Sequence, residues 1–391
     1  MIGVMSSKKR HAEIAGAGFA GLTAAAALAQ RGWSVRVHEL GDELRTAGAG
    51  IYIYENGLKV FEAVGAFDAV TRDAFPGRAR EMRDDTNTTV ARIEWPPGGK
   101  LRMYSIVRQR CIDALAEAAT KAGAEIVTGS EVVGAHPEGE LELRDGRRLK
   151  ADLVVGADGV GSPTRESLGL IRSWKSLPDG AIRLLIPRTQ DERINSDTQS
   201  YVEYWSGPRR VLYTPCSDEW VYLAILMLNT DEEAKRLPVD VAAWSRWFPH
   251  LEHLFPRIGD QGRWDPFLVI RLKRWSKGRV AIIGDAAHAM APNLGQGGGC
   301  GMMNGLSLAV YMDRHDDVAA ALADWERNER PLTEHTQRLS TYYGWPTTWP
   351  PKLRAKAYDL AHKSAWLNQQ RLRTASHTPT GWTGGSVEGG K

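Results

Sequence analysis

The feature that most constrains this chain is a glycine-rich turn near its N-terminus, GAGFAG at positions 16–21. It lies between a short apolar run and an alanine-rich stretch that ends at Arg31, an order typical of a strand, a turn and a helix. Gly16 permits a tight turn, Gly18 lets the backbone approach a pyrophosphate, and Gly21 lets the helix pack on the strand. Unpaired N–H groups at the helix N-terminus add donors for an anion, so the pattern predicts a dinucleotide site.

A second apolar run, Trp33 to Val37, leads to Glu39, about twenty residues past the glycines. A carboxylate at this position can accept hydrogen bonds from both hydroxyls of an adenosine ribose. Glutamate there favours an unphosphorylated ribose, as in FAD or NAD, and Leu40 beside it belongs to the same expected site. A glycine-punctuated helical hairpin without a ligand is the alternative interpretation of this stretch.

The composition is that of a large enzyme with two or more lobes. The 391 residues carry a net charge of +3 with both signs interspersed, which gives no electrostatic case for nucleic acid or a membrane surface. The cysteines Cys111, Cys216 and Cys300 are far apart, which implies reduced thiols and neither a disulfide framework nor a metal site. No apolar window approaches about eighteen residues, and Glu13 interrupts the only segment that resembles a secretory signal. We therefore expect a soluble, cytoplasmic protein.

Two later segments each combine a buried-strand pattern with an aspartate in a tight turn. The run 151–155 ends in GADG, which contains Asp158, and the run 280–283 ends in GDAAH, which contains Asp285. A carboxylate at the carboxyl end of a parallel strand is where an α/β sheet offers groups to a ligand. Pro292 and a glycine-rich loop follow, and consecutive glycine N–H groups at a helix start form an electropositive nest suited to a reduced flavin ring or a phosphate.

Together these motifs resemble the single-component FAD-dependent aromatic hydroxylases of the para-hydroxybenzoate hydroxylase type. GAGFAG with Glu39, the GADG segment and the GDAAH segment occur in the order of that family, and the likeness covers about residues 11 to 340. Within the family, GAGIY at 48–52 and RVLYTPC at 210–216 are similar to the hydroxypyridine-carboxylate oxygenases. The resemblance implies tightly but noncovalently bound FAD, with NAD(P)H as a transient co-substrate, since no second GxGxxG is present.

The resemblance also implies roles for individual residues. Gly16, Gly18 and Gly21 would hold the pyrophosphate, and Glu39 the ribose. Further FAD contacts would come from two arginines, the two turn aspartates and the shielding loop: Arg45, Arg108, Asp158, Asp285, Pro292, Gly295, Gly297 and Gly298. A surface ion pair is the alternative for each arginine. His288 is expected to be a structural histidine that orients its turn. The alternative is a role in flavin movement or proton transfer.

A sheet lying over the flavin is predicted between 181 and 274, where runs of β-branched and aromatic residues alternate with turns. The resemblance places Tyr52, Arg210 and Tyr222 in the substrate pocket, and a further pocket tyrosine of those oxygenases is replaced by a residue of 78–80. A ring that accepts an electrophilic oxygen must be electron-rich, and Arg210 can favour an oxyanion by charge. Packing of the tyrosines in a sheet core is the alternative.

The predicted fold is α/β, with a Rossmann-like FAD-binding domain, an interleaved β-sheet substrate domain and C-terminal helices. The FAD-binding domain is expected to comprise 1–75, 101–176 and 277–330, and the substrate domain 76–100 and 177–276. Helices are expected over 331–373 and a disordered tail over 374–391. The aromatic cluster at 342–349 is expected to pack between domains or in a dimer, so the protein would be a monomer or homodimer.

The predicted activity is an NAD(P)H- and O2-dependent monooxygenation of a small hydroxylated aromatic or N-heteroaromatic carboxylate. A hydroxypyridine carboxylate is favoured, with ring opening as a possible sequel, and neither a nucleic acid nor a membrane is an expected partner. A ring-retaining hydroxylase of the salicylate or hydroxynicotinate type is the nearest alternative. A flavin-dependent reductase or dehydrogenase that does not use O2, and a non-catalytic FAD sensor, are alternatives from other classes.

Overall fold

The computed structural model describes residues 9–44, 50–94, 101–194 and 200–384. Within them, six strands form a sheet in the order β18-β19-β12-β1-β2-β8, parallel except for its edge pair β18 and β19. The strands are β1 (His11–Ala15), β2 (Ser34–His38), β8 (Glu125–Val127), β12 (Leu153–Gly156), β18 (Ser276–Lys277) and β19 (Val280–Ile282). Both runs that were predicted to end in a turn aspartate are therefore neighbouring parallel strands of one sheet.

Helix α1 (Phe19–Gln30) follows the glycine turn and is buried along nearly its whole length. It packs against α4 (Arg108–Lys121) and α9 (Gly297–Arg314), so its alanines meet neighbours on several sides. A helix that is apolar all round is stable only inside a protein, which explains why this stretch reads as a continuous alanine-rich run. The larger hydrophobic core forms around this helix and the six-stranded sheet.

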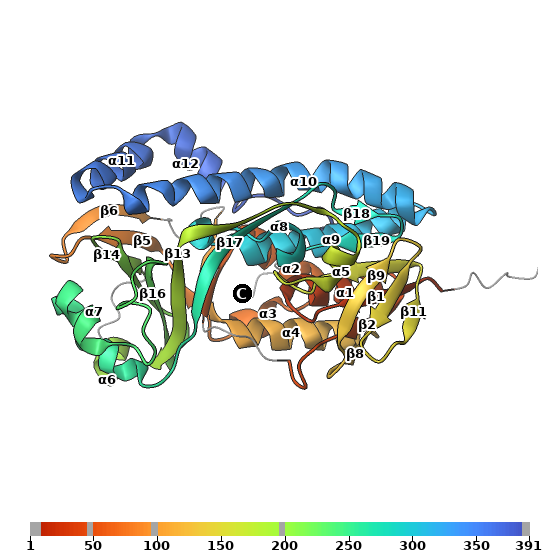
Figure 1. The fold of residues 1–391 in the computed structure, drawn as a ribbon, viewed down its shortest axis with the longest axis horizontal. Coiled ribbons are helices and arrows are strands. Elements are labelled where there is room, and N and C mark those ends of the chain that lie inside the picture. Colours follow the sequence, from red (N-terminus) through yellow and green to blue (C-terminus); the bar gives the residue numbers. More distant parts are fainter. Residues whose placement is uncertain (1–8, 45–49, 95–100, 195–199, 385–391) are drawn as a thin grey trace, which may run out of the picture.

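A second sheet in the described chain has the strand order β17-β13-β16-β15-β14-β5-β6. Its strands are β5 (Ala79–Arg83), β6 (Thr89–Glu94), β13 (Ile171–Pro187), β14 (Ser200–Ser206), β15 (Arg209–Pro215), β16 (Trp220–Leu228) and β17 (Trp264–Leu272). The long strand β13 pairs with both β16 and β17, and it runs from the side of the six-stranded sheet into this sheet (Figure 1). The strand runs predicted between 181 and 274 all lie in these strands.

Alternation along the strands gives this sheet two different faces. Ile182, Val211 and Ile225 point to one face, where they form a core with α7 (Val241–Trp247). Their neighbours Ala181, Arg210 and Ala224 line a cavity on the opposite face. Because side chains alternate with a period of two residues, one sheet provides both a domain core and the wall of a site.

Smaller elements join the two sheets. A three-stranded sheet with the order β3-β7-β4 (β3, Gly50–Tyr54; β4, Phe75–Pro76; β7, Met103–Val107) lies between them, and α2 (Glu55–Val64) and α3 (Phe67–Thr71) follow β3. A further antiparallel sheet has the order β11-β10-β9. The remaining elements are β9 (Val132–His136), β10 (Glu140–Leu143), β11 (Arg148–Lys150), α5 (Pro163–Ser167), α6 (Gln190–Ile194) and α8 (Asp285–His288), with short 3-10 turns at Pro249–Leu251, Phe255–Ile258, Pro292–Leu294 and Trp345–Thr348.

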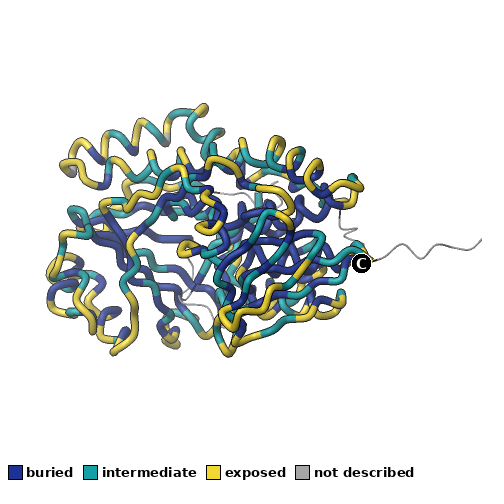
Figure 2. The backbone as a smooth tube through the Cα atoms, turned by 45° about the vertical axis from the view of Figure 1, so that its right-hand side comes forward, coloured by how far each residue is buried: buried dark blue, intermediate teal, exposed yellow. Residues whose placement is uncertain are grey.

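Helix α10 (Val318–Tyr343) runs along both halves of the molecule, and α11 (Pro351–Lys363) and α12 (Ala365–Leu372) follow at the far end (Figure 1). In the aromatic cluster, Tyr343 packs on Tyr358, whereas Tyr342, Trp345 and Trp349 are exposed. In the burial-coloured view, exposed residues in yellow alternate with more buried ones along α11 and α12 (Figure 2). No helix in the described part of the chain combines the length and apolar character needed to cross a bilayer.

The expected disorder from 374 onward differs from the structure over 374–384. Thr374 and Ala375 are buried, and the Ala375 carbonyl accepts a hydrogen bond from the Asn56 N–H at 3.1 Å. The Trp382 indole donates to Glu62 at 2.7 Å, which ties this segment to α2. The glycine-, serine- and threonine-rich composition predicted disorder because it gives no sign of these few anchoring contacts. Residues 385–391 lie outside the described part.

Candidate functional site

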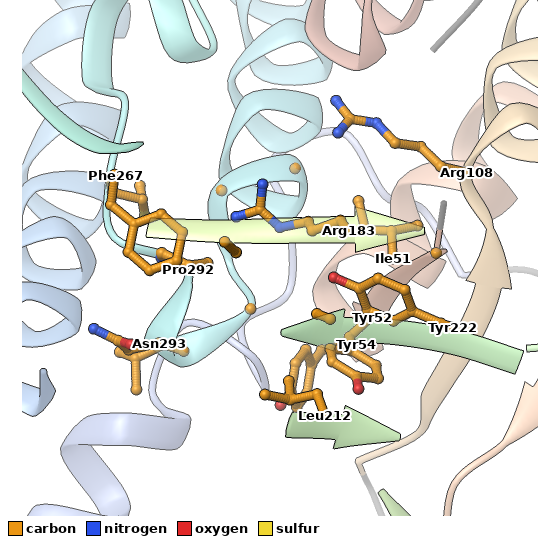
Figure 3. Close-up of a pocket in the computed structure, with 18 of the residues that line it drawn as sticks. Ile51, Tyr52, Tyr54, Arg108, Arg183, Leu212, Tyr222, Phe267, Pro292 and Asn293 are labelled. Atoms are coloured by element: carbon orange, nitrogen blue, oxygen red, sulfur yellow. The ribbon is translucent and has the colours of Figure 1, made fainter. Parts of the chain in front are cut away.

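A continuous cavity runs from the glycine turn to the seven-stranded sheet. Gly18, Phe19 and Asp285 line one end, and Arg210 and Leu212 line the other. An adjoining cavity includes Glu39, and both cavities share Arg108 and Arg183. Figure 3 shows these two arginines on one side of the space, facing a group of tyrosines from β3 and β16. The cavity therefore connects the glycine turn with one face of the seven-stranded sheet.

The structure gives a different geometric reason for glycine at each of the three positions of the turn. Gly16 has a φ of +96°, and a Cβ there would lie 2.4 Å from the Ala157 carbonyl oxygen. A Cβ on Gly21 would lie 2.0 Å from the Gly16 carbonyl oxygen, so the helix could not pack on the turn. A Cβ on Gly18 would meet nothing within 4 Å. Gly18 therefore faces open space beside the helix N-terminus, as an approaching pyrophosphate requires.

Glu39 lies directly beside this turn at the end of β2. Its carboxylate accepts hydrogen bonds from the N–H groups of Ala17 at 2.9 Å and Gly41 at 3.1 Å. A carboxylate has about four lone-pair sites, so it retains acceptor capacity for a ribose. The Leu40 side chain is 66% exposed. Arg45, which was expected to contact FAD, lies outside the described residues.

The two turn aspartates have different surroundings. Asp158 accepts hydrogen bonds from the Thr164 N–H and hydroxyl, so its carboxylate holds its own loop. Asp285 lines both cavities, where enclosure raises its pKa and the nearby charges of Arg108 and Arg183 counteract that rise. The buried Nε of Arg108 has no hydrogen-bond partner in the described chain. An unpaired cation and a carboxylate at the same end of the cavity fit the polar linker of FAD.

The glycine-rich loop closes the cavity next to β3. Pro292, Gly295, Gly297 and Gly298 all line the cavity, and α9 begins at Gly297. Backbone N–H groups at the start of α9 therefore lie at the cavity edge, where a helix N-terminus favours negative charge. A Cβ on Gly295 would approach the Tyr54 ring to 3.2 Å, so the loop lies close against the tyrosine group.

His288 lies buried beneath the same turn. The Asn304 amide donates to His288 Nε2 at 3.0 Å, and burial lowers the pKa of this histidine to about 4. Its ring lies 5.3 Å from the Trp275 ring. A neutral, hydrogen-bonded imidazole in a packed interior agrees with the structural role expected for it.

Three tyrosines form the middle of the cavity wall. The Tyr52 hydroxyl lies 2.7 Å from the Thr214 hydroxyl, and the Tyr52 ring lies 5.0 Å from Tyr201 and 5.6 Å from Tyr222. Burial raises the pKa of all three phenols, so they are protonated hydrogen-bonding groups at neutral pH. Figure 3 shows Tyr222 beneath Arg183, whose charge opposes the rise in the Tyr222 pKa.

Buried charges at the far end of the cavity form a chain of alternating sign. Arg80 Nη2 donates to the Glu203 carboxylate at 2.6 Å. Arg210 donates to Glu203 at 3.4 Å and to Asp179 at 2.8 Å. Arg210 thus lines the cavity, and two carboxylates balance the charge that was expected to favour a substrate oxyanion. Its buried Nε has no hydrogen-bond partner among the described residues.

Sequence reasoning did not single out Arg183, Glu203 or Asp179, although it indicated a replacement within 78–80, where Arg80 now lines the cavity. The available signal was a single charged residue within an otherwise uncharged strand segment. Glu203 lies between Val202 and Tyr204, and Arg183 between Ile182 and Leu184. Such residues face either water or a ligand, and only the assembled sheet distinguishes the two.

Comparisons with known proteins agree with this geometry. A family model described as an FAD binding domain matches residues 10–315. The chain is 41% identical to a 2-heptyl-3-hydroxy-4(1H)-quinolone synthase of Mycobacteroides abscessus over 84% of this chain and 88% of that protein. A Rhodococcus erythropolis protein named as a candidate for the same activity is 41% identical over 97% of this chain and 99% of its own length. The solved tetrameric form of 2-methyl-3-hydroxypyridine-5-carboxylic acid oxygenase is 37% identical, with a TM-score of 0.86 and coverage of 95% and 98%.

Proposed function

This chain belongs to the FAD-dependent aromatic monooxygenases, and we propose that within that family it hydroxylates an N-heteroaromatic ring that carries an oxygen substituent and no carboxylate. A 4-quinolone with an alkyl chain is the substrate class that we favour. The reaction inserts one atom of O2 as a C–OH in place of a ring C–H, and the other atom leaves as water. NAD(P)H supplies the two electrons. The proposal replaces the hydroxypyridine carboxylate that the sequence favoured.

FAD, when bound, supplies activation of O2 to an electrophilic oxygen donor. The glycine turn and Glu39 would hold its adenosine half, and Arg108, Asp285 and the start of α9 its linker and ring. Pro292 and the adjoining glycines line the same cavity and would limit the access of water to the reacting atoms.

The observation that carries the choice of substrate is the charge balance around Arg210. Arg80 and Arg210 contribute two positive charges, and Glu203 and Asp179 two negative ones. A carboxylate entering beside this neutral group would be desolvated without a free cation to compensate it, which is costly in a buried site. Arg183 is a cation outside this group, and the Asp285 carboxylate is the acidic group that interacts with its charge. A neutral ring meets no such penalty.

The lining of the cavity also suits an apolar substituent. Met103, Leu212, Ala224, Leu226 and Phe267 surround the polar groups. Burial of an alkyl chain against such side chains contributes about 0.8 kcal/mol per CH2 group. The relatives whose names specify a heptyl-quinolone product support the same class.

Polar groups of this chain would position the ring. Arg210, Tyr52 and Tyr222 all line the cavity, so the Arg210 guanidinium would donate to a ring oxygen and the two tyrosine hydroxyls would hold ring substituents. A hydrogen bond from a charged donor to a ring oxygen stabilises negative charge there, which helps set the position of the reaction.

A substrate panel tests this function. Purified protein would be incubated with NADH or NADPH, air and either 2-heptyl-4(1H)-quinolone, a hydroxypyridine carboxylate or a hydroxybenzoate. We expect the quinolone to stimulate NAD(P)H oxidation and to give a product 16 mass units heavier. Stimulation by the carboxylates but not by the quinolone would reject the proposed substrate class.

A further inference from the structure

Glu203 is an ionised acceptor that faces the substrate end of the cavity. Its carboxylate is buried, with 6% of the side chain exposed, yet it is among the cavity-lining residues. It lies on the same face of the seven-stranded sheet as Tyr201, two residues before it in β14, which also lines the cavity. A carboxylate in this position offers acceptor sites to whatever ring occupies the cavity.

The neighbours of Glu203 keep it charged without using all its acceptor capacity. Burial alone would raise the pKa of this carboxyl, but Arg80 and Arg210 hold it below the ordinary value. Each arginine contributes one hydrogen bond, at 2.6 Å and 3.4 Å. A carboxylate can accept about four hydrogen bonds, so sites remain for a donor on the substrate.

Glu203 and Arg210 both line the cavity and would offer the ligand one hydrogen-bond acceptor and one donor. Glu203 accepts, whereas the buried Arg210 Nε–H is a donor with no partner in the described chain. A ring that combines an N–H donor with a C=O acceptor, as in a 4-pyridone or a 4-quinolone, matches this pair. An ionised ring carboxylate does not, because it brings a second negative charge and no donor for Glu203.

We propose that Glu203 accepts a hydrogen bond from the ring N–H of the substrate and thereby selects and activates N–H heteroaromatic rings. This inference rests on the proposed function and specifies its substrate class further. In such a ring the nitrogen lone pair feeds the carbon that lies β to it. When that carbon forms the new C–O bond, positive charge develops at nitrogen, and loss of the proton from the reacting carbon then restores the ring. The N–H remains in place, and the Glu203 charge stabilises the developing positive charge.

A binding comparison separates this role from a structural one. The probes are 2-heptyl-4(1H)-quinolone and 2-heptylchromone, in which an oxygen replaces the N–H without added bulk. Their Kd values would be measured from the change in flavin absorbance of the holoenzyme. We expect wild type to bind the quinolone about tenfold to a hundredfold more tightly than the chromone, and Glu203→Gln to lose most of that preference.

Asp179→Asn is the matched control, because Asp179 also pairs with Arg210 on the same face of the sheet. It should weaken both ligands similarly and leave their ratio unchanged. Glu203→Asp, which keeps the charge, should recover part of the preference. FAD content and thermal unfolding of each variant report whether the fold is intact.

The rate of hydroxylation gives a second readout. Glu203→Gln should slow oxygen insertion into bound quinolone by about tenfold to a hundredfold and divert NAD(P)H oxidation to H2O2. An unchanged quinolone-to-chromone ratio in Glu203→Gln, with quinolone still hydroxylated, would overturn the role of Glu203 alone. Absence of quinolone hydroxylation by wild type would overturn the proposed function and this inference with it.

Discussion

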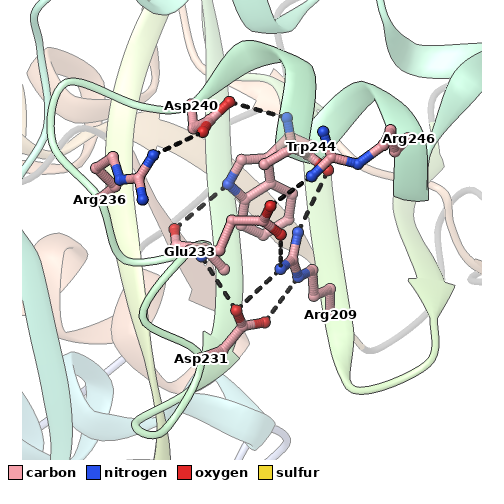
Figure 4. Close-up of polar contacts among 9 residues, drawn as sticks. Arg209, Asp231, Glu233, Arg236, Asp240, Trp244 and Arg246 are labelled. Atoms are coloured by element: carbon pink, nitrogen blue, oxygen red, sulfur yellow. Dashed lines mark hydrogen bonds and ion pairs between the residues drawn. The ribbon is translucent and has the colours of Figure 1, made fainter.

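Arg209 and Arg210 are adjacent in β15 and serve opposite faces of the same sheet. Arg209 pairs with Asp231 and Glu233 and donates to the Ala243 carbonyl of α7 (Figure 4). Arg210 pairs with Asp179 and Glu203 at the cavity. The two arginines have the same size and similar burial, but Arg209 contacts the sheet core and α7 whereas Arg210 contacts the cavity. Variants of the two residues therefore test stability and the site separately.

Arg210→Met should impair oxygen insertion while leaving FAD bound. The substitution keeps much of the side-chain volume but removes the donor for a ring oxygen, and one electrostatic stabiliser is typically worth about a hundredfold in rate. Product formed per NAD(P)H consumed should fall in the same variant. Arg209→Met should instead lower the free energy of unfolding and leave the rate of hydroxylation in the folded enzyme near that of wild type. Equal kinetic effects in both variants would place the substrate elsewhere.

Gly16→Ala and Gly18→Ala should fail in different ways. Alanine at 16 would clash with the Ala157 carbonyl and occupy an unfavourable φ, so it should destabilise the apoprotein. Alanine at 18 meets no atom in the protein, so the apoprotein should unfold at the wild-type denaturant concentration. It should nevertheless bind FAD more weakly, because its methyl group enters the space expected for the pyrophosphate. Denaturation of apoprotein and titration with FAD measure the two effects, and wild-type FAD affinity in Gly18→Ala would contradict the cofactor assignment.

Glu39→Gln should weaken FAD binding through loss of charge on the ribose acceptor. A hydrogen bond to a charged group contributes about 1.5 to 3 kcal/mol, which corresponds to roughly tenfold to a hundredfold in Kd. Glu39 also accepts N–H groups of Ala17 and Gly41, so Glu39→Ala should disturb the turn as well and weaken FAD further. Glu125→Gln, at an exposed carboxylate on the edge strand β8, is the control. FAD titration of the three apoproteins should give the weakest binding for Glu39→Ala, intermediate binding for Glu39→Gln and wild-type binding for Glu125→Gln.

Glu192 should make stability depend on acid pH. Although burial opposes ionisation, hydrogen bonds from Arg257, Tyr213 and the Thr189 N–H lower the pKa of Glu192 to about 2. Its contribution is therefore complete above the ordinary pKa near 4.5 and is lost as pH falls towards 2. Glu192→Gln should lower the free energy of unfolding by on the order of 3 kcal/mol at pH 7. Urea unfolding from pH 7 down to pH 3 should show this difference shrinking, and a difference independent of pH would disprove the linkage.

Much of the fold could be predicted from the sequence because its signals are local. The glycine turn, the alanine-rich helix and the two strands before Asp158 and Asp285 each occupy a short stretch with one dominant pattern. The ordered segment at 374–384 could not be predicted in this way. Its order depends on a few contacts with α2, such as that of Trp382 with Glu62, which are more than 300 residues apart.

Candidate residues at the glycine-turn end of the cavity could be named from the sequence more readily than those at the seven-stranded sheet. FAD residues follow spacing rules along one chain segment, whereas Arg80, Glu203 and Arg210 come from three strands that meet only in the assembled sheet. Arg210 was expected in the substrate pocket and lines the cavity, but the carboxylates that balance its charge come from positions 179 and 203. The pairing of these charged side chains therefore depends on the register of the assembled sheet.

The most direct test of the account is aerobic turnover of 2-heptyl-4(1H)-quinolone under 18O2, with the product analysed by mass spectrometry. We predict one product with the ring intact, 18 mass units heavier than the substrate, and close to one product formed per NAD(P)H consumed. A product that carries two labelled oxygens and an opened ring, or NAD(P)H oxidation that yields only H2O2, would contradict it.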